Sequence, residues 1–465
     1  MVSALTIETA THNVEATFVR PMGIDPGQHW GKPSQYAPSE LDHCGILKGM
    51  TIKRALLATL LALPIYAEDF QGADHPLEYD HDPVRYSETQ PTDAIAMLQQ
   101  KITNGEVKLE WDEKFGYLPS VLEALKVPKS SQMLVFSKTS LQRKHISPDN
   151  PRALYFNDDV YIGYVPGAPV MEISAVDPNL GGTFYFMELE KVRKPKFVRS
   201  ADCLSCHGGQ RSLGIPGHFL RSVPTDETGE LLTRDEVRDI DHCTPVVDRW
   251  AGWYVTGSSG PHRGNLIGAK DLAHFKEDPL AKVNITDLGK YFDQSKHIVK
   301  GSDIVALMVM EHQAHMHNYV ARLNIEAKQM LAAYGHVRYM RSQVDAFIRF
   351  LLFAEEAPLP VPVAGNPDFV RDFTASSIKD SKGRSLRDFD LKSRMFKHPC
   401  SFIIYTPSFD AIAGPIKEVI LQKLHDVLTG KNTDAQFAKV SPEDRNAILE
   451  ILRETKKNLP DYWRN

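Results

Sequence analysis

The feature that most constrains this chain is the run Cys203-Leu-Ser-Cys206-His207, which holds two of the five cysteines in 465 residues. Two thiols separated by two residues can both reach the vinyl groups on one edge of a porphyrin. The next residue then lies under the ring, where its imidazole can ligate the iron. The motif therefore predicts one covalent haem c, with Cys203 and Cys206 as thioether donors and His207 as the proximal iron ligand. A thiol redox pair and another kind of metal site are alternatives for the same residues.

A second feature concerns export. Residues 51–54 (TIKR) are basic, residues 55–65 (ALLATLLALPI) are apolar, and a small residue, Ala67, stands where cleavage is expected. These are the parts of a secretory signal peptide, and the apolar run is too short to span a bilayer. We therefore expect a signal peptide over residues 50–67. The alternative is an internal apolar helix that follows a genuine N-terminal extension.

A signal peptide belongs at the start of a chain, so we expect Met50 to be the true start and residues 1–49 to be an extension from a wrongly assigned gene start. The mature chain would then be residues 68–465, located in the periplasm or otherwise exported. Haem c is attached outside the cytoplasm, so this location agrees with the motif. The compartment is also oxidising.

The composition is that of a globular protein, with 42% hydrophobic and 24% charged residues. The net charge of −5 gives no basic excess for nucleic acid, and the mature chain has no apolar run long enough for an integral membrane segment. Residues 131–198 are rich in β-branched and aromatic residues between turn residues, whereas helical periodicity begins at Ser302. These patterns predict an α+β fold with an antiparallel sheet region, then a loop-rich haem-binding segment and a mainly helical C-terminal part.

The expected division is an α+β region with the covalent haem c site at 68–300, followed by a helical region at 301–465 that packs on the haem region. The residues quoted so far make the chain resemble a single-haem c-type cytochrome, although not the small soluble class, whose motif stands near the N-terminus. Further stretches resemble a family of large, poorly characterised exported bacterial haem proteins, namely 206–209 (CHGG) with 214–217 (GIPG), 249–254 (RWAGWY) and 310–313 (MEHQ). The resemblance covers most of residues 130–430. It implies the cofactor but no established reaction.

His207 leaves one axial position of the iron, and its occupant would separate electron transfer from ligand chemistry. The helix expected from Ser302 carries three histidines in six residues on an otherwise apolar surface. We rank His317 and His312 above His315 as the second iron ligand. The open alternatives are histidines that hydrogen-bond loops in the core, a second metal at Glu311, His312 and His315, and a thioether ligand from Met308 or Met310.

Positive side chains after the motif could bind the two haem propionates, a role that suits the geometry of arginine. The candidates in this loop-rich segment are Arg221, Arg249 and Arg263, with His218, His242 and His262 beside them. Trp250, Trp253 and Tyr254 are expected to form a wall of the haem site or the core. Cys243 and Cys400 could pair or could be buried thiols.

Two functions remain open from the sequence. The first is an exported monohaem c-type cytochrome that transfers electrons. The alternative is a haem c enzyme of peroxidase or oxidase type, or a small-gas sensor, with an open distal iron site. A redox partner protein or a small-molecule oxidant is the expected partner, and nucleic acid is not. A structural or interaction protein with an incidental haem is a third class.

Overall fold

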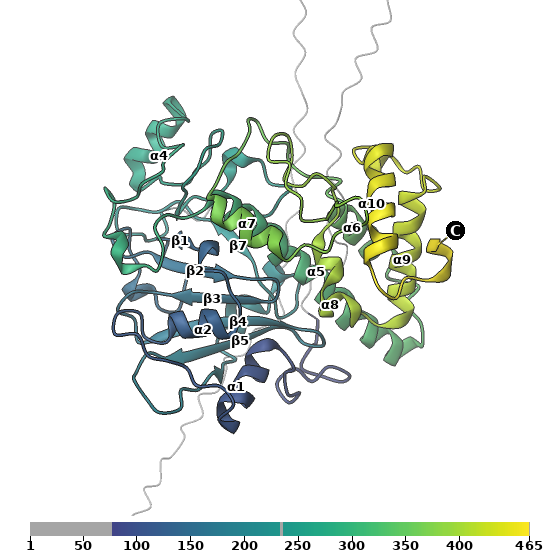
Figure 1. Cartoon of the computed structure of the whole chain (residues 1–465), viewed down its shortest axis with the longest axis horizontal. Helices are drawn as coiled ribbons and strands as arrows, with labels where there is room; N and C mark the ends of the chain where they lie inside the picture. Colours follow the sequence, from purple (N-terminus) through teal and green to yellow (C-terminus); the bar gives the residue numbers. More distant parts are fainter. Residues whose placement is uncertain (1–76, 233–235, 465) are drawn as a thin grey trace, which may run out of the picture. The chain divides into compact units, whose positions relative to one another are not determined.

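The computed structural model describes residues 77–232 and 236–464, so the expected extension (1–49) and signal peptide (50–67) lie outside the described residues. Its centre is an antiparallel sheet with the strand order β6-β5-β4-β3-β2-β1-β9 (Figure 1). The strands are β1 (Met133–Val135), β2 (Arg152–Phe156), β3 (Val160–Tyr164), β4 (Val170–Asp177), β5 (Gly181–Glu188), β6 (Val198–Arg199) and β9 (Trp253–Tyr254). A two-stranded sheet pairs β7 (Leu220–Ser222) with β8 (Arg238–Ile240).

The two faces of the large sheet differ because successive side chains of a strand point to opposite sides. One face carries Tyr155, Ile162 and Ile173, which are buried in a core shared with helices α1 (Ala94–Asn104) and α2 (Leu118–Ala124). On the other face, Gly163 lies between Leu154 of β2 and Glu172 of β4. This second face therefore has polar and small residues in the middle of the sheet, where a packed core would have large apolar ones.

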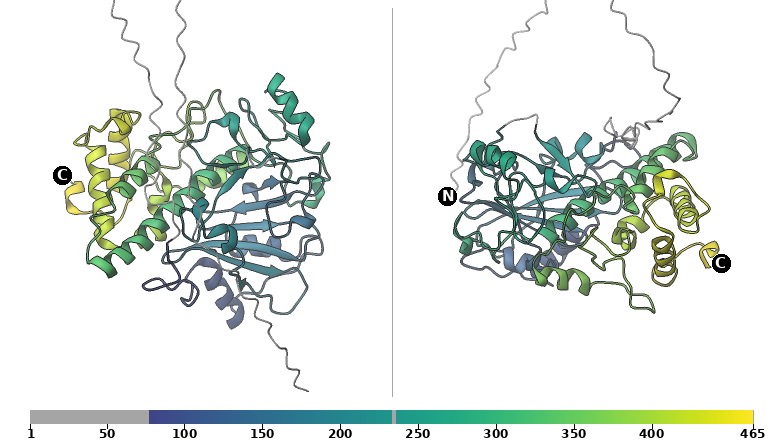
Figure 2. Two further views of the ribbon diagram at one scale, coloured as in Figure 1. Left: turned by 180° about the vertical axis from the view of Figure 1, so that it is seen from behind. Right: turned by 90° about the horizontal axis from the view of Figure 1, so that it is seen from above.

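Helix α5 (Ile304–Tyr334) lies between the sheet and the C-terminal helices (Figure 2). Its N-cap is Asp303, whose side chain accepts a hydrogen bond from the Ala306 amide at 2.8 Å, and it ends at Gly335 with a positive φ of 72°. The helix is buried along most of its length because it contacts both β5 and the helices beyond it. Those helices are α6 (Arg341–Leu351), α7 (Pro367–Ala375), α8 (Pro407–Asp410), α9 (Gly414–Leu428) and α10 (Pro442–Thr455).

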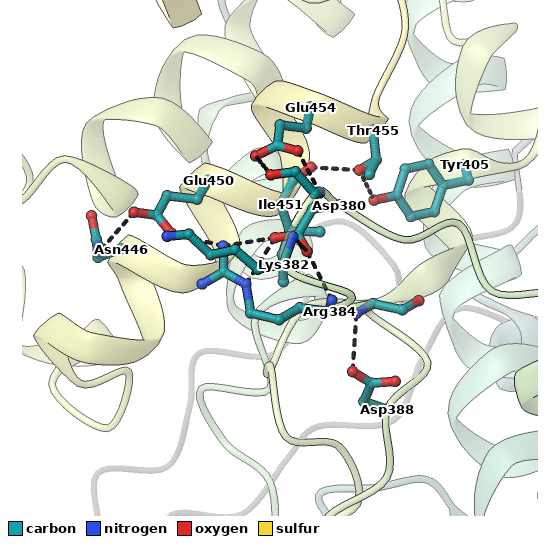
Figure 3. A network of polar contacts seen from close by, with 12 residues as sticks. Asp380, Lys382, Arg384, Asp388, Tyr405, Asn446, Glu450, Ile451, Glu454 and Thr455 are labelled. Atoms are coloured by element: carbon teal, nitrogen blue, oxygen red, sulfur yellow. Dashed lines mark hydrogen bonds and ion pairs between the residues drawn. The ribbon is translucent and has the colours of Figure 1, made fainter.

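A polar network fastens the segment after α7 to α10 (Figure 3). Arg384 bridges Asp380 and Glu450, both at 2.7 Å, and Lys382 also reaches Glu450 at 2.7 Å. The Ser381 amide donates to Glu454 at 2.6 Å. Residues 379–385 carry no apolar side chain, so these charge-assisted bonds attach them to the helix.

The α+β prediction is confirmed, with the antiparallel strands first and a helical C-terminal part after them. The helix expected from Ser302 is α5, and the helical C-terminal part after it contains α6 to α10. Neither the short strands β7, β8 and β9 nor helix α4 (Gly268–Glu277) was predicted, because the loop-rich segment has no sustained periodicity. Within the described residues no helix has the length and apolarity needed to cross a membrane.

Candidate functional site

A cavity of about 500 Å³ lies between the polar face of the sheet and the loop-rich segment. Cys203, Cys206 and His207 all lie on its wall, and Met310 of α5 and Trp253 of β9 also line it. Its volume falls in the range of small-molecule and cofactor sites, roughly 300–1,000 Å³. The motif therefore faces an internal space of the size that a cofactor needs.

His207 ends the four-residue helix α3 (Leu204–His207), and its ring is held in one orientation. Its Nδ1 atom lies 2.9 Å from the carbonyl oxygen of Gly217, and its ring packs between Phe184 and Phe219, with centroid distances of 4.9 and 4.8 Å. A carbonyl only accepts hydrogen bonds, so Nδ1 must carry the proton and Nε2 keeps a free lone pair. Within the described residues Nε2 has no hydrogen-bond partner. Burial lowers the pKa of His207, so the imidazole is neutral, as a metal ligand must be.

The two motif cysteines are free thiols in this structure, and Cys206 is exposed while Cys203 is half-buried. Burial, with a smaller contribution from Glu172, raises the pKa of the Cys203 thiol to about 11. Reactive thiols of redox sites have a lowered pKa, because the thiolate is the nucleophile. The surroundings of Cys203 thus disfavour the redox-pair interpretation.

Gly163 forms part of the cavity wall on strand β3. A Cβ atom built on Gly163 would lie at ordinary contact distances, 3.4 Å from Leu154 Cδ2 and 3.6 Å from Glu172 Oε2. The backbone does not require glycine here, so the missing side chain leaves space above the sheet. Glycine inside a strand often marks the close approach of a ligand, and this position fits a flat group lying against the sheet.

Charged side chains also line the cavity. Arg152 donates to Glu172 at 2.8 Å, and Glu172 accepts a second hydrogen bond from Ser140 Oγ at 2.7 Å. The Nε of Arg152 is buried without a partner in the described part of the chain. Arg221 also lies on the wall; there it packs near the Phe219 ring and has no ion-pair partner among the described residues. Arg221 can therefore bind a carboxylate in this cavity, whereas Arg152 is already paired with Glu172 and offers its unpartnered Nε.

Of the three arginines predicted to bind propionates, only Arg221 lines the cavity. Arg249 is buried in an ion pair with Glu311, which also accepts a hydrogen bond from Trp250 Nε1 at 3.1 Å. Arg263 pairs with Glu236 at 3.4 Å and lies 3.7 Å from Asp248. Arg249 and Arg263 therefore do not line the cavity, and each is paired with carboxylates.

The two histidines predicted as second iron ligands also lie off the cavity wall. His312 uses both ring nitrogens, Nδ1 with His242 Nδ1 at 2.9 Å and Nε2 with Ser401 Oγ at 2.8 Å. His317 Nδ1 bonds the hydroxyl of Tyr161 at 2.9 Å, and its Nε2 is buried without a partner among the described residues. The arrangement of His312 corresponds to the alternative of histidines that hydrogen-bond in the core. His315 likewise contacts aromatic rings.

The sequence did not point to Arg152, Gly163 or Glu172 of the cavity wall, and it named His218 and Met310 only as secondary candidates. His218 has its Nε2 atom 2.9 Å from Ser174 Oγ and a buried Nδ1 without a partner in the described residues. Met310, ranked below the histidines, lines the cavity and is 7% exposed. The signal that could have found the wall is the alternation of strands β3 and β4, which puts Gly163 and Ser174 where a core face would be apolar. Cys243 and Cys400 are unpaired thiols.

No family model, curated protein or solved structure matches this chain. Over residues 77–232 and 236–464, no three His, Cys, Asp or Glu side chains are grouped so that they could hold a metal ion. A four-coordinate zinc site would need such a group around Cys203 and Cys206. The support for a function therefore comes from the cavity and the residues that line it.

Proposed function

We propose that this chain is an exported monohaem c-type cytochrome that transfers electrons through a haem bound covalently at Cys203 and Cys206. One observation carries the proposal. Both thiols and His207 line a single cavity of about 500 Å³. His207 Nδ1 donates a hydrogen bond to the Gly217 carbonyl, which leaves the lone pair of Nε2 free to bind a metal. A metal-binding histidine is usually oriented by such a bond from its other ring nitrogen.

The residues of the wall fit this cofactor in further respects. Gly163 leaves space for a flat ring against the sheet, and Arg221 and Arg152 are suited to the propionates. When bound, haem supplies reversible one-electron chemistry. The chain holds it by two thioether bonds, orients His207 through Gly217, and surrounds the site with Phe184, Trp253 and other apolar side chains.

The exposure of Cys206 supports electron transfer. A second hollow of about 450 Å³ adjoins the first and is lined by Cys206, Arg211, Phe219 and Arg221. A cofactor bound through Cys206 would therefore lie beside this hollow. A redox partner protein could approach it there, which is the arrangement that electron exchange needs.

A haem c enzyme or small-gas sensor is the second candidate, and the Arg152–Glu172 pair favours it. This pair lines the cavity at 2.8 Å, with partial exposure of 17% and 28%. A carboxylate and a guanidinium beside a reacting group are suited to proton transfer and charge stabilisation. An open iron beside them would allow ligand chemistry.

The test is to produce residues 68–465 in an exporting host that has haem-attachment machinery, and to record optical spectra of the oxidised, reduced and carbon monoxide-treated reduced protein. The proposal predicts covalent haem and a low-spin spectrum that carbon monoxide does not change. Covalent haem with rapid carbon monoxide binding would support the enzyme or sensor. A protein without covalent haem would refute both.

Two variants sharpen this experiment. Cys203→Ala with Cys206→Ala should abolish covalent attachment, whereas Cys243→Ala should leave it unchanged, because Cys243 does not line the cavity. His207→Ala should retain the thioether bonds but change the spin state of the iron. If the His207 variant has the spectrum of the parent protein, the ligand assignment is wrong.

A further inference from the structure

The segment from His207 to His218 is a closed loop that two side chains of α5 fasten, Arg322 at the Leu213 carbonyl and Asn318 at the base of the loop. The Gly217 amide donates to the His207 carbonyl at 2.9 Å, and the Gly217 carbonyl accepts from His207 Nδ1, so the loop is closed twice at its base. Asn318 then accepts a hydrogen bond from the His218 amide at 2.9 Å and donates one to the His218 carbonyl at 2.5 Å. Through these bonds a helix residue 100 positions later in the chain holds the peptide whose carbonyl accepts the hydrogen bond from His207.

We propose that Asn318 is a positioning residue for His207: it holds the Gly217–His218 peptide so that the Gly217 carbonyl accepts the Nδ1 proton, and it thereby helps to set the reduction potential of the haem. This inference rests on the proposed function. It adds a residue that makes no contact with the cofactor itself.

The fit between Asn318 and the loop is tight. Asn318 is 1% exposed, and both ends of its carboxamide are used, which fixes its orientation. A Cβ atom on Gly217 would overlap Asn318 Oδ1 and would lie 3.0 Å from both Asn318 Cγ and Ser212 Cβ. Glycine is therefore needed at position 217 for Asn318 to reach the backbone of His218.

Ser212 stabilises the loop from inside. Its hydroxyl lies 2.7 Å from the Ile215 carbonyl and 3.1 Å from the His207 carbonyl. The loop thus has its own internal bonds, Arg322 of α5 holds its middle through the Leu213 carbonyl at 3.0 Å, and Asn318 holds the Gly217–His218 peptide. Removal of Asn318 should loosen the Gly217–His218 peptide without unfolding the whole loop.

The expected effect on the iron follows from the charge on the ring. A carbonyl that accepts a hydrogen bond from Nδ1 raises the electron density and basicity of Nε2. Stronger donation stabilises the oxidised iron more than the reduced iron, so the bond lowers the reduction potential. If the peptide moves away, the potential rises.

The chain offers a matched control, Asn324, which lies on the same helix and is equally buried, at 1% exposure. It also bonds two backbone groups, the Pro178 carbonyl at 2.9 Å and the Ala413 amide at 3.2 Å, but none in the loop. Asn318→Ala and Asn324→Ala should therefore lose similar stability. Only the first should change the iron.

The experiment measures the reduction potential of the holoprotein and the NMR signal of the His207 Nδ1 proton in the reduced state. Asn318→Ala should raise the potential and weaken protection of this proton from exchange, while Asn324→Ala leaves both as in the parent. Asn318→Asp serves if the alanine variant does not load haem: it keeps the acceptor for the His218 amide but adds a negative charge that itself lowers the potential, so its readout is exchange of the His207 Nδ1 proton, which should be faster than in the parent.

Equal potentials for the Asn318 variants and the parent, or equal shifts for Asn318→Ala and Asn324→Ala, would overturn the positioning role while leaving the haem assignment intact. A parent protein without covalent haem would instead overturn the proposed function, and this inference with it. The two failures are therefore distinguishable.

Discussion

The contact between Gly217 and Asn318 makes a quantitative prediction for Gly217→Ala. The new methyl group would overlap Asn318 Oδ1 and press on Asn318 Cγ and Ser212 Cβ at 3.0 Å. Both neighbours are buried, and Asn318 is held by two hydrogen bonds, so neither can move aside freely. The backbone at position 217 does not have a positive φ, so the effect should be purely steric.

The magnitude follows from two contributions. Overpacking of one methyl group in a rigid site costs about 1–3 kcal/mol. If Asn318 is displaced, each lost hydrogen bond costs a further ~1 kcal/mol. We expect Gly217→Ala to lower the free energy of unfolding by about 2–4 kcal/mol, from the sum of these contributions. In an Asn318→Ala background the methyl group has space, and the same substitution should cost less than about 1 kcal/mol.

The assay is urea unfolding of the parent, both single variants and the double variant, with equal dependence on urea required for comparison. The cycle should give a coupling energy of about 1–3 kcal/mol between the two sites. Gly209→Ala is the control, because a Cβ at Gly209 meets nothing within 4 Å and the backbone is extended. Additive effects of Gly217→Ala and Asn318→Ala on the free energy of unfolding would show that the new methyl group does not clash with Asn318.

Three further predictions concern the cavity and the C-terminal network. Gly163→Leu should fill space above the sheet and reduce covalent haem content, whereas Gly163→Ala should not, because its Cβ has ordinary contacts. Haem staining of purified protein with matched circular dichroism checks this. Equal haem loading of both variants would contradict it. Met310→Ala should leave haem content unchanged but allow carbon monoxide to bind the reduced protein, which the parent should not do, since the change removes a side chain from the wall. Optical spectra measure this, and a variant spectrum that carbon monoxide leaves unchanged would count against it. Hydrogen bonds from Lys382 and Arg384 lower the pKa of Glu450 to about 2, so its stabilisation is present above the ordinary carboxyl pKa and is lost as the pH falls through about 2. Glu450→Gln should therefore lower the melting temperature at pH 7 and have a smaller effect at pH 3, and an equal loss at both pH values would contradict the ion pairing.

The main elements could be predicted because their signals are local. Runs of β-branched and aromatic residues identify β2 to β5, and the apolar period with Gly335 at its end identifies α5. The strands β7 and β9 are three residues or shorter and exist only because other segments pair with them. No local pattern specifies such strands.

The site could be predicted only where it is contiguous in sequence. Cys203, Cys206 and His207 identify themselves by spacing, but the opposite wall comes from strands that precede the motif by about 30–50 residues. The sequence ranked His317 and His312 above His315 as iron ligands, but it could not place any of the three relative to the motif. The rotation of the helix decides between them: it turns Met310 to the cavity and His312 to Ser401, and this depends on packing against the whole sheet.

Arg249 illustrates the same limit. An arginine after a haem motif suggests a propionate partner, but a buried carboxylate is an equally good one, and Glu311 lies 62 positions away. Asn318 shows the converse case, because nothing local indicates that its amide meets the backbone of His218. Both pairings are set by where α5 crosses the loop-rich segment.

Peptide mass mapping of the exported protein is the most direct test of covalent haem attachment at Cys203 and Cys206. The chain 68–465 is produced with haem-attachment machinery, digested, and the peptide that contains residues 203–207 is weighed. We expect one haem on this peptide, bound through both Cys203 and Cys206, with Cys243 and Cys400 as unmodified thiols. An unmodified peptide, or a disulfide between Cys203 and Cys206, would contradict the assignment of these residues to a covalent haem.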